Sequence, residues 1–211
     1  MQTLTPVLSL SRLEAGVRRG GRRTSALAMA LILGSLAFGS ACTKVQNDNS
    51  SSYLIVDSLL GASGAQPAQM GGTLESDVLT KGGVFEDPGQ ITFKLGLKDA
   101  GTPETPSKPT SANYITVTSY HVDFARTDGG AVPASFDGGL SLTVNDIGGV
   151  ATFTLVPASA KTVSPLAALA GTANEIQTVA TITFFGADQA GRKVSVKATI
   201  SVNFADWGDP S

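Results

Sequence analysis

The chain has 211 residues, of which 42% are hydrophobic and only 15% charged, with 24 glycines and 10 prolines. This composition is too apolar for a disordered chain and too rich in glycine and proline for a helical bundle. With one cysteine and one histidine, the chain can form neither an internal disulfide nor a zinc site made of cysteine and histidine ligands.

Residues 1–41 have the layout of a secretory signal peptide. Residues 12–23 carry five arginines against a single acidic residue, Glu14. The apolar run 26–38 follows, and as a helix it would cover about 20 Å, short of the roughly 30 Å hydrocarbon core of a bilayer. We therefore expect export, by either the general secretory or the twin-arginine route.

Three small residues, Gly39-Ser40-Ala41, precede the only cysteine, Cys42. This stretch resembles the lipobox of bacterial lipoproteins, although Gly39 stands where leucine is commonest in that family. The resemblance implies that Cys42 receives acyl chains, becomes the new N-terminus and anchors the protein to a membrane of the bacterial cell envelope, periplasmic or surface-facing. Ordinary signal peptidase also accepts such small residues, and its cleavage would leave Cys42 as a free thiol.

The charge of the chain changes when the signal peptide is removed. Residues 1–41 hold five of the 15 basic residues and one of the 17 acidic residues, so the remainder has 10 basic and 16 acidic residues and a net charge of −6. An acidic surface repels nucleic acid and anionic lipid headgroups. We expect no nucleic-acid partner, and membrane attachment through the acyl chains on Cys42 alone.

Residues 42–52 are polar and without periodicity, which predicts a flexible tether, and residues 53–211 are predicted to form one domain. Short alternating apolar runs in this domain are separated by turn residues, as in β-strands. The predicted strands are 53–60, 73–79, 90–98, 114–127, 140–144, 150–156, 176–186 and 193–204.

Two segments define the expected architecture most clearly. Apolar side chains alternate strictly from Val194 to Val202, and a short connection joins this run to residues 179–185, which predicts an antiparallel hairpin. In the strand 114–127, Tyr120 and the alternate residues after it are expected to face the core. The chain is therefore predicted to be all-β, a single antiparallel β-sandwich of about seven to nine strands, with only a short helix at Pro165–Ala170.

The same segments resemble immunoglobulin-like and fibronectin type III-like modules of bacterial surface proteins. Residues 120–126, followed by Asp128-Gly129, are similar to a third strand of such a sandwich, and residues 185–191 to its closing hairpin. The chain lacks the cysteine pair of antibody domains, and its one tryptophan, Trp207, follows the last strand. The resemblance implies an immunoglobulin-like sandwich that serves binding, adhesion or scaffolding.

His121 is the first candidate site residue, with Asp123 two positions along on the same strand face. As a general base it would need a nucleophile and a pocket, and the sequence indicates neither. We therefore expect a histidine on the strand surface that pairs with a neighbour, and we assign no catalytic residue.

Acidic residues and glycine pairs recur near the predicted strand ends. Clustered carboxylates could bind calcium, although none has the spacing of a known calcium loop, and the glycine pairs are predicted to be turns. Trp207 with Phe204 is either an aromatic anchor for a ligand or, as we favour, a cap on the open end of the sandwich. The acidic positions are Glu86, Asp87, Asp99, Asp128, Asp137, Asp146, Asp188, Asp206 and Asp209, and the glycine pairs are 71–72, 82–83, 138–139 and 148–149.

These patterns favour a non-catalytic protein that binds a protein partner in the envelope and uses no cofactor. A calcium-dependent, carbohydrate-binding or small-ligand module is the alternative. A hydrolase with a pocket that the sequence does not reveal is a further one.

Overall fold

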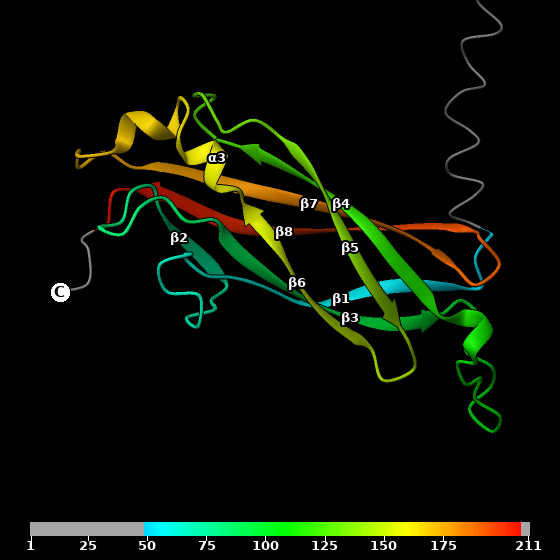
Figure 1. Ribbon diagram of the computed structural model, residues 1–211. Coiled ribbons are helices and arrows are strands. Elements are labelled where there is room, and N and C mark those ends of the chain that lie inside the picture. Colours follow the sequence, from blue (N-terminus) through cyan, green and yellow to red (C-terminus); the bar gives the residue numbers. More distant parts are fainter. Residues whose placement is uncertain (1–48, 208–211) are drawn as a thin grey trace, which may run out of the picture. The chain divides into compact units, whose positions relative to one another are not determined.

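The computed structural model describes residues 49–207, so the predicted signal peptide 1–41 and Cys42 lie outside the described residues. Eight strands in this part of the chain form two sheets, with strand orders β1-β3-β6 and β2-β8-β7-β4-β5 (Figure 1). The chain between 49 and 207 is therefore all-β apart from three short helical turns. The strands are β1 (Ser52–Gly61), β2 (Thr73–Asp77), β3 (Asp87–Leu97), β4 (Ile115–Ala125), β5 (Phe136–Val144), β6 (Gly149–Val156), β7 (Ile176–Asp188) and β8 (Lys193–Ala205).

The helical turns are short, and none of the helices within residues 49–207 is long and apolar enough to cross a membrane. They are the 3₁₀ turns η1 (Ser111–Asn113) and η2 (Leu166–Leu169) and the single α-helical turn α3 (Ala158–Lys161). The helix predicted at Pro165–Ala170 is present as η2. Its Leu166 and Leu169 are buried, which explains the apolar spacing that predicted it.

The predicted hairpin 176–204 is confirmed, because β7 and β8 pair antiparallel from Ile176 opposite Phe204 to Ala187 opposite Lys193. The expectation of a wholly antiparallel structure is wrong at one pairing, since β2 pairs with β8 in parallel. β2 therefore runs in the same direction as β8. The connection from β1 to β2 leaves the end of β1 and returns to it, since Gly71 forms an antiparallel bridge with Gly61. That connection, residues 62–72, forms a loop beside the outer edge of β2.

The two sheets enclose one core, and a bulge in β4 explains how that strand contributes to it. Tyr120, Val122 and Phe124 are buried as predicted, but Ile115 and Val117, on the opposite face of a regular strand, are buried as well. The register of β4 shifts between Val117 and Ser119 against both of its neighbours. A bulge adds one residue and reverses the alternation, so both halves of β4 face inward.

An aromatic cluster joins the sheets across the core. Phe93 and Phe153 come from the three-stranded sheet, and Tyr120 and Phe184 from the five-stranded sheet. Their ring centroids lie 5.0 Å apart for Tyr120–Phe153, 5.1 Å for Phe93–Phe184 and 5.4 Å for Phe153–Phe184, all with edge-on geometry. Such contacts stabilise a pair beyond the area it buries. The cluster therefore fixes how the two sheets face each other.

The start of β5 differs from the prediction. The strand begins at Phe136 rather than Leu140, because Gly138 and Gly139 lie within it and do not form the predicted turn. A Cβ atom at Gly138 would lie only 2.1 Å from Cζ of Tyr120. Glycine is therefore needed here for close approach of a strand to an aromatic ring, a use that the sequence alone cannot distinguish from a turn.

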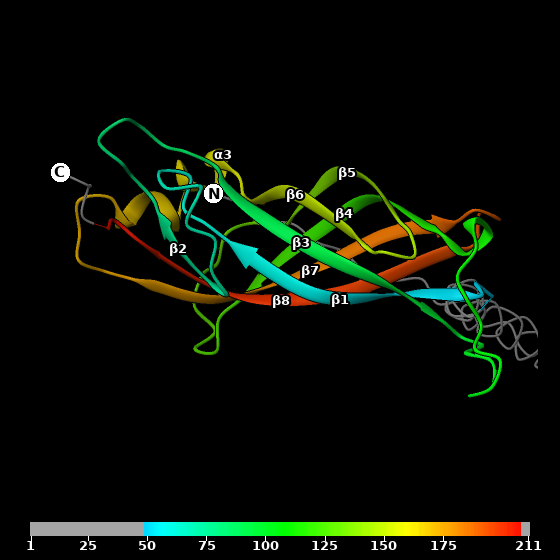
Figure 2. The same cartoon turned by 90° about the horizontal axis from the view of Figure 1, so that it is seen from below.

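The domain has two distinct ends (Figures 1 and 2). We call the end with the start of β1 and the β7–β8 turn the N-terminal end, and the end with β2 and α3 the far end. At the N-terminal end the hydroxyl of Ser52 donates to the carbonyl of Asn113 at 2.6 Å, and Arg192 donates to the carbonyl of Asn49 at 2.7 Å. The last residues of the predicted tether are thus bonded to the domain.

A buried carboxylate, Asp87 at the start of β3, organises the far end. Its Oδ1 accepts hydrogen bonds from Nζ of Lys161 at 2.7 Å and from the N–H of Gly64 at 2.8 Å, and its Oδ2 accepts one from the hydroxyl of Ser76 at 2.6 Å. Lys161 also donates to the carbonyl of Asp77 at 2.8 Å. Burial raises the pKa of the Asp87 carboxyl, while Lys161, Ser76 and Gly64 oppose that shift.

We predict that Lys161→Met lowers the free energy of unfolding by about 3–5 kcal/mol, because it leaves the Asp87 carboxylate buried without its cation. The matched control is Lys94→Met, which removes a cation from the exposed pair with Asp57 and should cost less than about 1 kcal/mol. Urea denaturation of both variants measures the difference. Equal effects in the two variants would contradict a central role for the buried pair.

Candidate functional site

His121 lies on the outer face of the five-stranded sheet, and both of its ring nitrogens face carboxylates. Nε2 is 3.2 Å from Asp123, the partner that the sequence suggested, and Nδ1 is 2.8 Å from Asp137. Sequence reasoning missed Asp137, because only the register of β5, which places it opposite His121, brings the two together. With both nitrogens engaged, the imidazole is not available to take a proton from a substrate.

The pairing also favours the protonated form of His121. The hydrogen bond with Asp137 raises the pKa of His121 above its ordinary value of 6.5, desolvation opposes that shift, and Asp123 raises the pKa further. A histidinium held between two carboxylates is a surface ion cluster. The arrangement supports the interpretation of His121 as a strand-surface histidine paired with its neighbours.

The acidic residues do not gather at one end of the domain. Asp188 lies at the N-terminal end, where its Oδ1 accepts the N–H groups of Ala190 and Arg192 at 2.9 Å, whereas Asp87 lies at the far end. Within residues 49–207, no three His, Cys, Asp or Glu side chains are placed to hold a metal ion together. Asp209 lies outside the described residues. The side chain of Asp188 therefore stabilises the turn between β7 and β8, since it accepts hydrogen bonds from that turn.

Phe204 and Trp207, which the sequence analysis considered together as one aromatic pair, occupy different environments. Phe204 is fully buried and its ring packs against Phe124, with the centroids 5.8 Å apart. Trp207 is half-buried, and its backbone N–H donates to Oδ1 of Asp77 at 3.2 Å. Phe204 is therefore a core residue, and of this pair only Trp207 is placed where a ligand can reach it.

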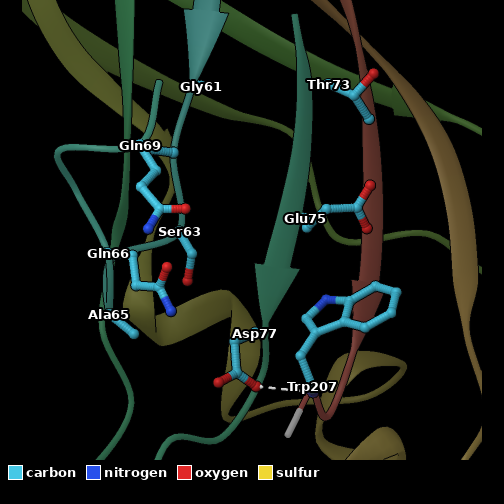
Figure 3. A pocket seen from close by; sticks show the side chains of 10 residues that line it. Gly61, Ser63, Ala65, Gln66, Gln69, Thr73, Glu75, Asp77 and Trp207 are labelled. Carbon is cyan, nitrogen blue, oxygen red and sulfur yellow. Dashed lines mark hydrogen bonds between the residues drawn. The ribbon is translucent and has the colours of Figure 1, made fainter. Parts of the chain in front are cut away.

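Trp207 lines a pocket of about 210 Å³ at the far end, which we call the far-end pocket (Figure 3). One wall is the 62–72 loop, and the other is the outer side of β2 together with Trp207. The polar side chains that line it are Ser63, Gln66, Gln69, Thr73, Glu75 and Asp77. Sequence reasoning identified Trp207 as a candidate site residue but none of these polar side chains. The loop carries no motif, and its position depends on the pairing of β2 in the folded structure.

The loop wall is held by a close backbone contact. A Cβ atom at Gly64 would lie 2.1 Å from the carbonyl oxygen of Glu86, so this position requires glycine. The contact brings the N–H of Gly64 to the buried carboxylate of Asp87. The far-end pocket therefore rests on the same ionic network that joins α3, β2 and β3.

Hydrogen bonds to β8 and to the segments that follow β2 and β8 hold the β2 wall of the pocket in place. Oε1 of Glu75 accepts a hydrogen bond from Nδ2 of Asn203 on β8 at 3.1 Å, and Asp77 binds both Trp207 and, at 2.9 Å, the hydroxyl of Thr80. Nε1 of Trp207 is buried and has no hydrogen-bond partner among the described residues. The indole ring is therefore positioned by its backbone and its packing, without a hydrogen bond of its own.

Comparison of the chain with models of protein families, with curated proteins and with solved structures finds no match.

We predict that the folded state is stabilised by the charge of His121 below pH 6.5 and loses that contribution as the pH rises through the raised pKa of this residue. The sign follows because a raised pKa means that the folded state binds the proton more tightly than the unfolded state. NMR titration of the single imidazole should give a pKa above 6.5 in the wild type and a lower value in Asp137→Asn. An unchanged pKa in Asp137→Asn would refute the assigned contact.

Proposed function

We propose that this chain is an exported bacterial lipoprotein, anchored by acyl chains on Cys42, whose domain binds another component of the cell envelope. The observation that carries the proposal is the order of residues 12–42: a basic stretch, a short apolar run, small residues and then the only cysteine of the chain. An unpaired thiol is unusual in an exported protein, and acylation accounts for its presence at this position.

The strand order supports an immunoglobulin-like sandwich. The sheet β1-β3-β6 corresponds to the A, B and E strands of such a domain, and β8-β7-β4-β5 to its G, F, C and C′ strands. The short β2, which pairs in parallel with the last strand, fits between the first two strands of this scheme. Modules of this architecture serve many binding functions, so the fold supports a binding role by analogy alone.

The geometry of the N-terminal end gives the anchored domain an orientation. Seven residue steps separate Cys42 from Asn49, and an extended chain of that length spans at most about 25 Å. With acyl chains on Cys42, the N-terminal end would stay within that distance of the membrane surface. The far end, with its pocket, would then face away from the membrane toward other envelope components.

A binding role is favoured over catalysis by the state of the one imidazole. His121 is held between Asp123 and Asp137, and no nucleophilic side chain is bonded to it in the described structure. The network of Asp87 and Lys161 is sealed from solvent and joins secondary-structure elements. These two clusters therefore support stability, whereas the far-end pocket is a feature suited to a ligand.

The anchoring proposal predicts that cells fed radiolabelled palmitate incorporate label into the wild-type protein and not into Cys42→Ala. Because Cys42 is the only cysteine, no other thiol can carry the acyl group. Immunoblotting for the unprocessed precursor controls for export of the variant. Equal labelling of both proteins, or labelling of neither, would refute the proposal.

The binding proposal predicts that a photoreactive amino acid at an exposed position near the binding surface forms one discrete adduct in living cells. Leu79 at the far end and Phe185 on the outer face of the five-stranded sheet are both about 42% exposed and provide a matched pair of positions. From the orientation above, we expect the adduct from position 79. Absence of an adduct at both positions would contradict binding through these surfaces.

A further inference from the structure

The far-end pocket has the size of a site for one small ring. Its volume of about 210 Å³ lies below the roughly 300–1,000 Å³ of pockets that hold drug-sized ligands. It lies between the 62–72 loop and the edge strand β2, and the side chains labelled in Figure 3 project from both walls. A ligand of about a dozen non-hydrogen atoms, or the terminal unit of a longer chain, matches this space.

The chemistry of the lining disfavours an anionic ligand and suits one with many hydroxyl groups. The amides of Gln66 and Gln69 supply both donors and acceptors, the hydroxyls of Ser63 and Thr73 do the same, and Glu75 supplies an acceptor. None of the described residues that line the pocket is basic, so a phosphate, sulfate or carboxylate ligand would find no cation there. Hydroxyl groups, which both donate and accept, suit this set.

Trp207 supplies the remaining part of a sugar site. A pyranose ring has an apolar face of C–H groups as well as hydroxyls around its edge, and an indole ring offers an apolar surface of matching size. Trp207 is half-buried beside Glu75 and Asp77. The hydrogen bond from its backbone N–H to Asp77 fixes the backbone from which the ring projects. Nε1 has no hydrogen-bond partner among the described residues, so a ligand that packs against the ring breaks no bond of the indole to this part of the chain.

We infer that the far-end pocket binds an uncharged sugar ring, with the indole of Trp207 against its C–H face and with Glu75 and Gln66 hydrogen-bonded to its hydroxyls. The inference goes beyond the proposed function, and it concerns only residues of the described domain. It therefore stands or falls independently of the acylation of Cys42.

Trp207 is the only tryptophan of the chain, so intrinsic fluorescence reports on this pocket alone. The full chain, solubilised in a detergent without a sugar headgroup, is titrated with glucose, galactose, mannose, N-acetylglucosamine and their disaccharides. We expect at least one of these to shift the emission of Trp207 saturably, with a dissociation constant on the order of 1–10 mM for a monosaccharide. Saturation-transfer NMR of the sugar protons provides a readout that does not depend on the tryptophan.

Two variants keep the fluorescent reporter and remove its polar neighbours. Glu75→Ala and Gln66→Ala should each weaken sugar binding at least tenfold, because each removes a group that bonds the ligand. Glu104→Ala, in the exposed loop between β3 and β4 at the other end of the domain, is the matched control and should bind like the wild type. An unchanged unfolding midpoint shows that each variant is folded.

Two results would overturn the inference. One is the absence of any fluorescence or saturation-transfer response up to about 500 mM sugar, 50-fold above the upper end of the expected dissociation constants. The other is binding that survives unchanged in both pocket variants while they remain folded, which would place the sugar elsewhere on the protein. The outcome of the palmitate-labelling experiment has no bearing on either result, so the anchoring proposal and the sugar-binding inference can fail independently.

Discussion

The buried carboxylate of Asp87 is the interaction on which the far end of the domain depends. An isolated carboxylate in a protein interior is strongly unfavourable, so the surroundings must supply a cation and hydrogen-bond donors. They come from three places in the chain: Lys161 in α3, Ser76 in β2 and the backbone N–H of Gly64 in the 62–72 loop. Lys161 also donates to the carbonyl of Asp77. One charge thereby links α3, β2, β3 and the 62–72 loop. The requirement explains why a polar loop lies in a defined place.

The far-end pocket follows from this constraint. The connection from β1 to β2 returns to the end of β1 at the Gly61–Gly71 bridge, and this loop lies beside the edge of β2. The contact from Gly64 to Asp87 holds that loop near the strand, and a pocket remains between them. An edge strand is exposed to pairing with other chains unless something covers it. The loop covers the edge of β2 and, in doing so, builds a surface of hydroxyl, amide and carboxylate groups beside Trp207.

Local sequence patterns predicted the strands well and the contacts between them poorly. The alternation from Val194 to Val202 predicted β8 and its hairpin, because a half-buried strand needs that period. Asp123 was found as a partner of His121 since both lie on one strand, whereas Asp137 was missed because its approach depends on the register of β5. Gly138 was taken for a turn residue, although its role is to make room for Tyr120 across the strands. Each error concerns a contact between residues far apart in the sequence.

The sequence by itself determined that the described domain is all-β, where each of its eight strands lies within a few residues, and that Cys42 follows a signal-like segment. These features are local, since strand alternation and turn chemistry act over two to ten residues. Only the tertiary structure decided the parallel pairing of β2, the contact of His121 with two carboxylates and the pocket beside Trp207. Those depend on how strands are ordered and registered across two sheets, and no local pattern encodes that order because it is set by packing of the whole core.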